Sequence, residues 1–134
     1  MIFVTGATGF IGQRLVEKLK VQGERIKVLS RSQHPEFETV VCDLQREVIP
    51  DGALEGVDTV FHLAGFAHDL RDASELEGEY RKVNVDATVR LAELAVRAGV
   101  KRFVFVSSVK AVSRVRLSLL WLLQGQECLF SPNA

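Results

Sequence analysis

The sequence predicts an α/β protein built on a doubly wound parallel sheet with strand order 3-2-1-4-5. Five short runs are almost entirely apolar, as expected of strands that are buried on both faces of a parallel sheet. Longer amphipathic stretches alternate with these runs, which indicates helices that connect the strands. Because crossovers between parallel strands are right-handed, helices on both faces of the sheet lead to this strand order.

The first strand is predicted over residues 2–5, and a glycine-rich turn follows it at once. An amphipathic helix then runs to about Gly23, with apolar residues at three- to four-residue spacing. The other strands are predicted over 25–29, 39–42, 58–63 and 102–106, with a short helical stretch around 52–56.

A long helix is predicted over about 74–98, with a break near Gly78. Gly99 is a natural C-terminal cap for it. Its second half carries the apolar residues Val85, Val89, Leu91, Leu94, Ala95 and Ala98.

Composition bounds the class of protein. The chain has 134 residues, of which 47% are apolar, so one domain with a buried core is expected. Seventeen basic and seventeen acidic residues give no net charge, so neither nucleic acid nor an anionic membrane is an expected partner. No run reaches the roughly 18 apolar residues of a membrane span, and residues 1–6 lack signal-peptide features, so a cytoplasmic protein is expected.

Cysteine usage gives no sign of a disulfide framework or a metal site. The two cysteines, Cys42 and Cys128, lie outside any CxxC motif and near no histidine. We therefore expect no metal centre.

The glycine turn is the first candidate site. Gly6, Gly9 and Gly12 lie between a predicted strand and a predicted helix, with the hydroxyl of Thr8 in the loop. In a dinucleotide-binding turn the first glycine permits the tight turn, the second lets the backbone approach a pyrophosphate, and the third lets the helix pack closely. The alternative is a plain strand–helix turn that uses glycines. A P-loop is excluded because no Gly-Lys-Ser/Thr follows.

The end of the second strand bears on the form of the cofactor. An acidic residue there would hold the ribose 2′-hydroxyl of NAD, but the sequence has Ser30, Arg31 and Ser32. A guanidinium flanked by hydroxyls suits the 2′-phosphate of NADP, which makes NADP the preferred cofactor over NAD. The alternative is a solvated arginine in a loop.

Five short motifs follow one another along the chain: TGATGFIG at 5–12, CDL at 42–44, HLAG at 62–65, NV at 84–85 and VSSV at 106–109. Together they resemble the extended short-chain dehydrogenase/reductase family of NAD(P)-dependent epimerases and dehydratases, which includes enzymes like UDP-glucose 4-epimerase. The resemblance implies a Rossmann domain followed by a smaller sugar-nucleotide domain. It also implies oxidoreductase or isomerase chemistry by transient hydride transfer on a nucleotide sugar or a related substrate.

The resemblance assigns cofactor contacts residue by residue. The pyrophosphate would be bound by Gly6, Gly9, Phe10 and Ile11. Asp43 and Leu44 would contact the adenine, with a turn or helix-capping role as the alternative for Asp43. The wall beside the ribose and nicotinamide would be Leu63, Ala64 and Gly65, which could otherwise be only a tight loop. Asn84 and Ser107 belong to the same cofactor-binding set.

The catalytic residues that the resemblance implies are incomplete in this chain. Ser108 matches the serine or threonine that hydrogen-bonds the substrate, and capping of the strand end is its alternative role. The family's Tyr-x-x-x-Lys pair is absent, because the single tyrosine, Tyr80, is followed four residues later by Asn84 and the last lysine is Lys110. His62, at the end of a buried strand, is expected to be a core residue and not a catalyst.

Residues 113–134 do not continue the pattern of residues 1–112, which we take as the NAD(P)-binding domain. Leucines and Trp121 cluster over 117–123. One interpretation is a truncated or frame-shifted end without a substrate domain; another is a helix that covers the sheet edge or forms a homo-oligomer. A helix on a membrane surface is less favoured, because only Arg114 and Arg116 are basic here.

Three hypotheses for the function follow. The first is a nucleotide-binding member of this family that is truncated and catalytically incomplete. The second is an active epimerase or reductase that uses another acid/base or is completed by a partner chain. The third is a non-enzymatic module that senses NADP or mediates an interaction.

Overall fold

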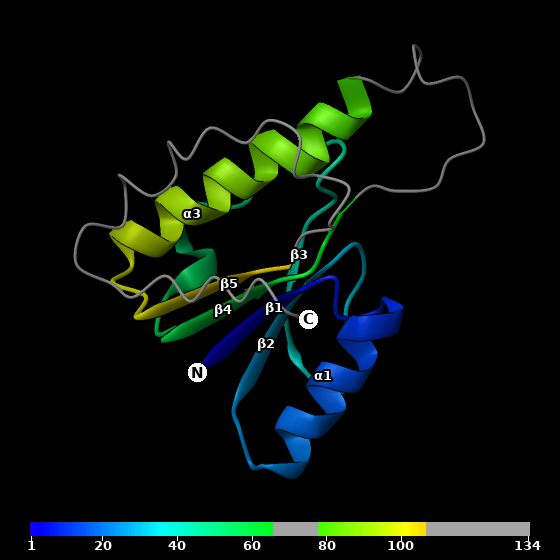
Figure 1. Ribbon diagram of the computed structural model, residues 1–134, viewed down its shortest axis with the longest axis vertical. Helices are drawn as coiled ribbons and strands as arrows, with labels where there is room; N and C mark the ends of the chain where they lie inside the picture. Colours follow the sequence, from blue (N-terminus) through cyan, green and yellow to red (C-terminus); the bar gives the residue numbers. More distant parts are fainter. Residues whose placement is uncertain (66–77, 107–134) are drawn as a thin grey trace.

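The computed structural model describes residues 1–65 and 78–106. Five parallel strands form one sheet: β1 (Ile2–Thr5), β2 (Ile26–Ser30), β3 (Glu38–Val41), β4 (Thr59–His62) and β5 (Arg102–Phe105). Their order is β3-β2-β1-β4-β5, which confirms the predicted topology (Figure 1). The strand bounds lie within one residue of the predicted ones.

Helices cover both faces of the sheet, as a doubly wound fold requires (Figure 1). The α-helix α1 (Phe10–Val21) packs on one face, and α3 (Ala87–Arg97) packs on the other together with the 3-10 helix η1 (Asp51–Leu54). A π-helical segment, η2 (Lys82–Asp86), leads directly into α3. No helix in these two described ranges has the length and apolar character needed to cross a membrane.

Side chains alternate between two cores along each central strand, because successive residues of a strand point to opposite faces. On β1, Phe3 joins the core under α3, whereas Val4 joins the core under α1. Leu29 and Val28 divide in the same way on β2. These strands are therefore apolar on both faces, which explains why they read as continuous hydrophobic runs in the sequence.

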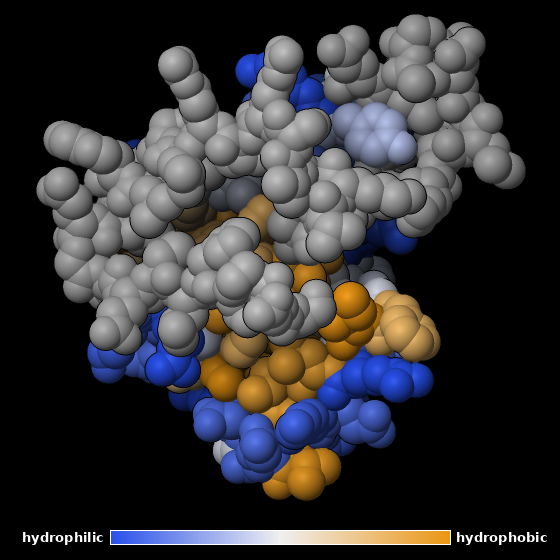
Figure 2. All heavy atoms as spheres, in the orientation of Figure 1, coloured by the Kyte–Doolittle hydropathy of each residue, from blue (hydrophilic) through white to orange (hydrophobic). Residues whose placement is uncertain are grey.

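The core on the α1 side extends beyond the helix itself. Ile2, Phe61 and Leu63 pack against this core but remain only partly buried. Figure 2 shows apolar side chains gathered in the middle of this face, with a band of hydrophilic side chains below them.

The prediction of which apolar residues of the long helix are buried is partly wrong. Val85 and Val89 are exposed, whereas Leu91 and Leu94 are buried as expected. The positions three and four residues before Leu91 belong to Thr88 and Ala87, and both are buried. Helical spacing therefore places small residues against the sheet and turns the two valines toward solvent.

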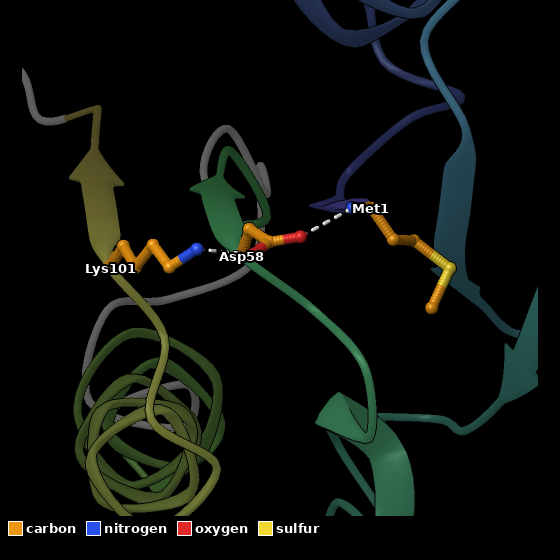
Figure 3. A network of polar contacts seen from close by, with 3 residues as sticks. All are labelled: Met1, Asp58 and Lys101. Atoms are coloured by element: carbon orange, nitrogen blue, oxygen red, sulfur yellow. Dashed lines mark hydrogen bonds and ion pairs between the residues drawn. The ribbon is translucent and has the colours of Figure 1, made fainter.

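A polar network joins the starts of three neighbouring strands (Figure 3). Asp58, directly before β4, accepts a hydrogen bond from the Met1 α-ammonium at 2.7 Å and one from Lys101 Nζ at 3.1 Å. The N–H of Asp58 donates to the carbonyl of Met1 as well. Asp58 thus connects β1, β4 and β5 at the edge opposite the carboxyl ends of the strands.

Candidate functional site

A cleft of about 370 Å³ opens at the carboxyl ends of the central strands. This is where open parallel sheets bind ligands, because the loops diverge where the strand order reverses on either side of β1. The residues that line it are Gly6, Thr8, Gly9, Leu29, Ser30, Arg31, Cys42, Asp43, Leu44, Gln45, Leu63, Ala64, Gly65 and Val83. Ten of these were predicted from the sequence as cofactor-binding residues.

The three glycines of the turn serve different purposes. Gly6 has φ of +71°, and a Cβ there would lie 2.7 Å from the backbone nitrogen of Ala64. A Cβ at Gly12 would overlap the carbonyl oxygen of Gly6, so this glycine allows α1 to pack against the turn. At Gly9 a Cβ would meet only the Gly6 carbonyl oxygen, at 3.3 Å. Gly9 is therefore the glycine whose missing side chain leaves room for a ligand.

The N-terminus of α1 faces the same cleft. Gly9 is its N-cap and makes no side-chain capping bond, and the first turn carries no acidic residue. The first-turn N–H groups and the positive end of the helix dipole are thus suited to an anionic group. The side chains of Phe10 and Ile11, 76% and 58% exposed, do not line the cleft, so any contact to a ligand would come from their backbone.

The end of β2 contributes Ser30 and Arg31 to the lining. Arg31 is exposed at this rim, and no acidic side chain stands at the position where NAD-specific sites place one. Among the residues that line the cleft, the acidic one is Asp43, which belongs to the loop after β3.

Asp43 has the turn role that was the alternative to adenine binding, and it also lines the cleft. Its Oδ1 accepts the N–H of Gln45 at 3.1 Å, and its own N–H donates to Glu47 Oε2 at 2.6 Å. Leu44 lies beside it in the lining. The carboxylate is thus fixed by its own turn, which leaves Leu44 to offer an apolar surface.

The wall opposite Arg31 comes from the segment after β4. The N–H of Ala64 donates to Thr5 Oγ1 at 3.1 Å, which ties this wall to the end of β1. A Cβ at Gly65 would lie 3.5 Å from Asn84 Oδ1, so Asn84 stands next to the wall without lining the cleft itself. Ser107 and Ser108 lie outside the described residues.

His62 is a buried core residue, as expected. Its ring is fully buried and hydrogen-bonded through both nitrogens, and burial lowers its pKa from 6.5 to about 4. Within residues 1–65 and 78–106, no three His, Cys, Asp or Glu side chains come together as metal ligands.

Four lining residues were not predicted: Leu29, Cys42, Gln45 and Val83. Leu29, Cys42 and Val83 directly precede predicted site residues, and Gln45 directly follows one. Cys42 also belongs to the CDL motif, whereas adjacency was the only signal for the other three. Burial raises the pKa of the Cys42 thiol, with smaller contributions from Glu47 and Asp43, so this thiol stays protonated and unreactive.

The family model for the NAD-dependent epimerase/dehydratase family matches residues 2–118. The chain belongs to this family. A 3-beta-hydroxysteroid dehydrogenase of Mycolicibacterium neoaurum is 35% identical over 120 residues, which cover 83% of this chain and 32% of the relative. A UDP-glucose 4-epimerase of Vibrio cholerae is 38% identical over 117 residues, covering 81% of this chain and 35% of the relative.

Solved structures of this epimerase/dehydratase superfamily share the fold. MoeE5 in complex with UDP-glucose and NAD superposes with a TM-score of 0.69 at 37% identity, covering 81% of this chain and 36% of that chain. A short-chain dehydrogenase/reductase superfamily protein from Agrobacterium tumefaciens with bound NAD gives 0.70 at 36% identity, covering 81% and 32%. The chain spans about a third of the length of the curated relatives that it matches.

Proposed function

We propose that the cleft binds NAD(P), with the pyrophosphate against Gly9 and the N-terminus of α1. The observation that carries this proposal is the open position at Gly9, which lies in the cleft lining at the N-cap of a helix without an acidic first turn. A diphosphate needs close backbone approach and free N–H donors, and this position offers both. The NAD-bound relatives support the same assignment.

Around this anchor, the remaining lining residues would hold the two halves of the dinucleotide. Leu44 and the Asp43 turn would contact the adenine, and Leu63, Ala64 and Gly65 would stand beside the nicotinamide ribose. When bound, the nicotinamide would supply hydride-transfer chemistry. The chain's own described residues bind and orient the cofactor.

The Gly9→Val variant tests this proposal. A branched side chain would occupy the place of the pyrophosphate, so we expect NADH and NADPH binding to be lost while the fold persists. Gly52→Val in η1 is the matched control, because a Cβ there meets only the Glu55 side chain. Unchanged affinity in a folded Gly9→Val protein would exclude the assignment.

We further propose that the cleft prefers NADP over NAD. The support is the rim at the end of β2, where Arg31 and Ser30 stand and no acidic side chain competes for the ribose 2′-hydroxyl. A guanidinium binds a phosphate through paired charged hydrogen bonds, which a 2′-hydroxyl cannot match.

For the whole activity, we propose a nucleotide-binding part of an epimerase or dehydratase that acts on a nucleotide sugar or a related hydroxyl or carbonyl substrate. These 134 residues hold no Tyr-x-x-x-Lys pair, so the group that the family uses to pass the proton accompanying hydride transfer is missing here. We expect no turnover by this chain alone. Steady-state assays with NAD(P) and a nucleotide sugar test this, and robust turnover would favour an active enzyme.

A further inference from the structure

A continuous series of buried and part-buried hydrogen bonds runs behind the wall of the cleft. The N–H of Ala64 donates to Thr5 Oγ1 at 3.1 Å, and Thr5 Oγ1 lies 2.6 Å from His62 Nδ1. On the other side of the ring, His62 Nε2 lies 2.8 Å from Thr88 Oγ1, which donates to the Asn84 carbonyl at 3.1 Å. We call these five residues the Thr5–His62–Thr88 relay.

The two ends of the relay fix the direction of every bond in it. A carbonyl only accepts, so the Thr88 hydroxyl donates to Asn84 and must accept from His62 Nε2–H. A neutral imidazole with a proton on Nε2 accepts at Nδ1, so the Thr5 hydroxyl donates there. Thr5 Oγ1 then accepts the N–H of Ala64, and every donor and acceptor of the relay is satisfied.

The surroundings of His62 keep the ring neutral. Its hydrogen-bond partners are both hydroxyl groups, and the rings of Phe103 and Phe105 lie 6.4 and 5.5 Å from it between centroids. A charged imidazolium would carry two donors, and the Thr5 hydroxyl would then lose its acceptor in the core. The relay is therefore complete only in one tautomer of the neutral ring.

The relay joins the two sides of the cleft. Thr5 directly precedes Gly6 of the glycine turn, and His62 directly precedes the wall segment Leu63 to Gly65. Thr88 lies just after the π-helical segment, whose Val83 lines the cleft. Bonding of a threonine hydroxyl to the carbonyl four residues earlier also helps to hold a helix away from regular α geometry.

We propose that the relay positions the wall of the cleft against the π-helical segment, with His62 as the neutral Nε2–H tautomer. This rests on the proposed function of the cleft as a dinucleotide site. Thr5, His62 and Thr88 are positioning residues, since they lie behind the lining. Without the Thr88 hydroxyl, the carbonyl of Asn84 loses a donor and His62 Nε2–H loses its acceptor, so Val83 and Asn84 can shift relative to Ala64.

The tautomer is tested without any cofactor. Nitrogen-15 spectra of the histidine rings in the wild-type chain at pH 7 distinguish protonated from unprotonated ring nitrogens. We expect His62 to show a protonated Nε2 and an unprotonated Nδ1. The opposite tautomer, or a charged ring, would overturn the relay whether or not the cleft binds a dinucleotide.

The positioning role is tested with Thr88→Val, which keeps the shape of the side chain and removes the hydroxyl. We expect the Kd for NADPH to rise about tenfold, as for one buried hydrogen bond, and Thr88→Ser to stay within about threefold of wild type. Thr59→Val, at the opposite end of β4, is the matched control and should leave the Kd unchanged. An unchanged Kd in folded Thr88→Val would overturn the positioning role.

A measurement on the wild-type chain covers the case in which Thr88→Val does not fold. The His62 Nε2–H proton signal should shift during titration with NADPH, because the wall that it supports contacts the ligand. A signal that stays fixed through saturation would overturn the positioning role. If the wild-type chain binds neither NADPH nor NADH, the proposed function of the cleft fails, while the tautomer result still decides the relay.

Discussion

At the scale of single residues, the buried His62 makes the stability of the fold depend on pH. Its pKa falls from 6.5 to about 4 through burial, so the unfolded chain takes up a proton before the folded chain does. The contribution of the neutral His62 to the free energy of unfolding is therefore full above pH 6.5 and declines as the pH falls toward 4. At about 1.4 kcal/mol for each pH unit of difference, the loss amounts to roughly 3 kcal/mol.

Urea unfolding between pH 7 and 4.5 measures this loss. The comparison variant is His34→Gln, which changes a partly buried histidine near β3 and leaves His62 in place, so the loss should persist in it. A free energy of unfolding that stays level across this range would contradict the burial of a neutral imidazole.

A second residue-scale prediction concerns Arg31 at the rim of the cleft. Arg31→Ala should weaken NADPH binding by about 1–3 kcal/mol, the cost of lost charged hydrogen bonds, and barely change NADH binding. Calorimetric titration with both cofactors measures the difference, and Arg97→Ala on α3 controls for the loss of a positive charge. Equal losses for the two cofactors would show that Arg31 does not contact the 2′-phosphate.

The residues of the cleft were predictable where local spacing carries the information. The glycine turn, Arg31 and the segment after β4 stand at fixed offsets from apolar runs, so the sequence alone placed them near one another. Val83 joins the lining because η2 packs beside the end of the sheet, and no local pattern encodes that packing. Asp43 both lines the cleft and holds its own turn, and only the hydrogen bonds of the structure reveal that second role.

At the scale of elements, Asp58 ties together three strands that are distant in sequence. Hydrogen bonds from the Met1 ammonium, and then from Lys101, hold the pKa of this carboxyl below its usual 3.8. A carboxyl with a lowered pKa stabilises the fold above its unfolded pKa, and this contribution is lost as the pH falls through the folded pKa.

We therefore expect Asp58→Asn to lower the melting temperature at pH 7. The difference from wild type should shrink below pH 3.8, where the wild-type carboxyl also becomes protonated. Asp86→Asn is a suitable control, because that carboxylate is 3.8 Å from its arginine partner, Arg81. Equal melting temperatures of Asp58→Asn and wild type at pH 7 would show that the network adds nothing.

Element boundaries followed from the sequence more closely than helix faces did. Strand runs are short and apolar, so their ends differ by one residue at most from the prediction. The face of α3 was harder, because Ala87 and Thr88 are buried in place of the more hydrophobic Val85 and Val89. The π-helical segment before α3 could not be predicted, since its contact with Thr88 belongs to a network that extends from Thr88 through His62 to Thr5.

At the scale of the whole molecule, one face of the sheet is incompletely covered by the described residues. α1 packs over β1 and β2, whereas Phe61 on β4 and Val104 on β5 stay partly buried. Val106, which directly follows β5 and shares the face of Val104, is half exposed. This apolar surface lies next to the point where the described chain ends.

The leucine-rich run 115–123 lies outside the described residues, and its burial in the folded chain or in a homo-oligomer stays a prediction. Leaving each large apolar side chain in water forfeits about 1.5–3 kcal/mol, so we expect Trp121 to emit at short wavelength. Fluorescence and sedimentation together measure this. A fully solvated emission from a monomer would contradict it.

The position of the Met1 amine has a practical consequence for handling the protein. A fusion tag or an acetyl group on that nitrogen would convert the ammonium into an amide, and Asp58 would keep only Lys101 as a cationic partner. The added atoms would also be attached directly before Ile2, the first residue of β1, which is the central strand of the sheet. Preparations that carry an uncleaved N-terminal extension should therefore melt earlier than preparations whose amine is free.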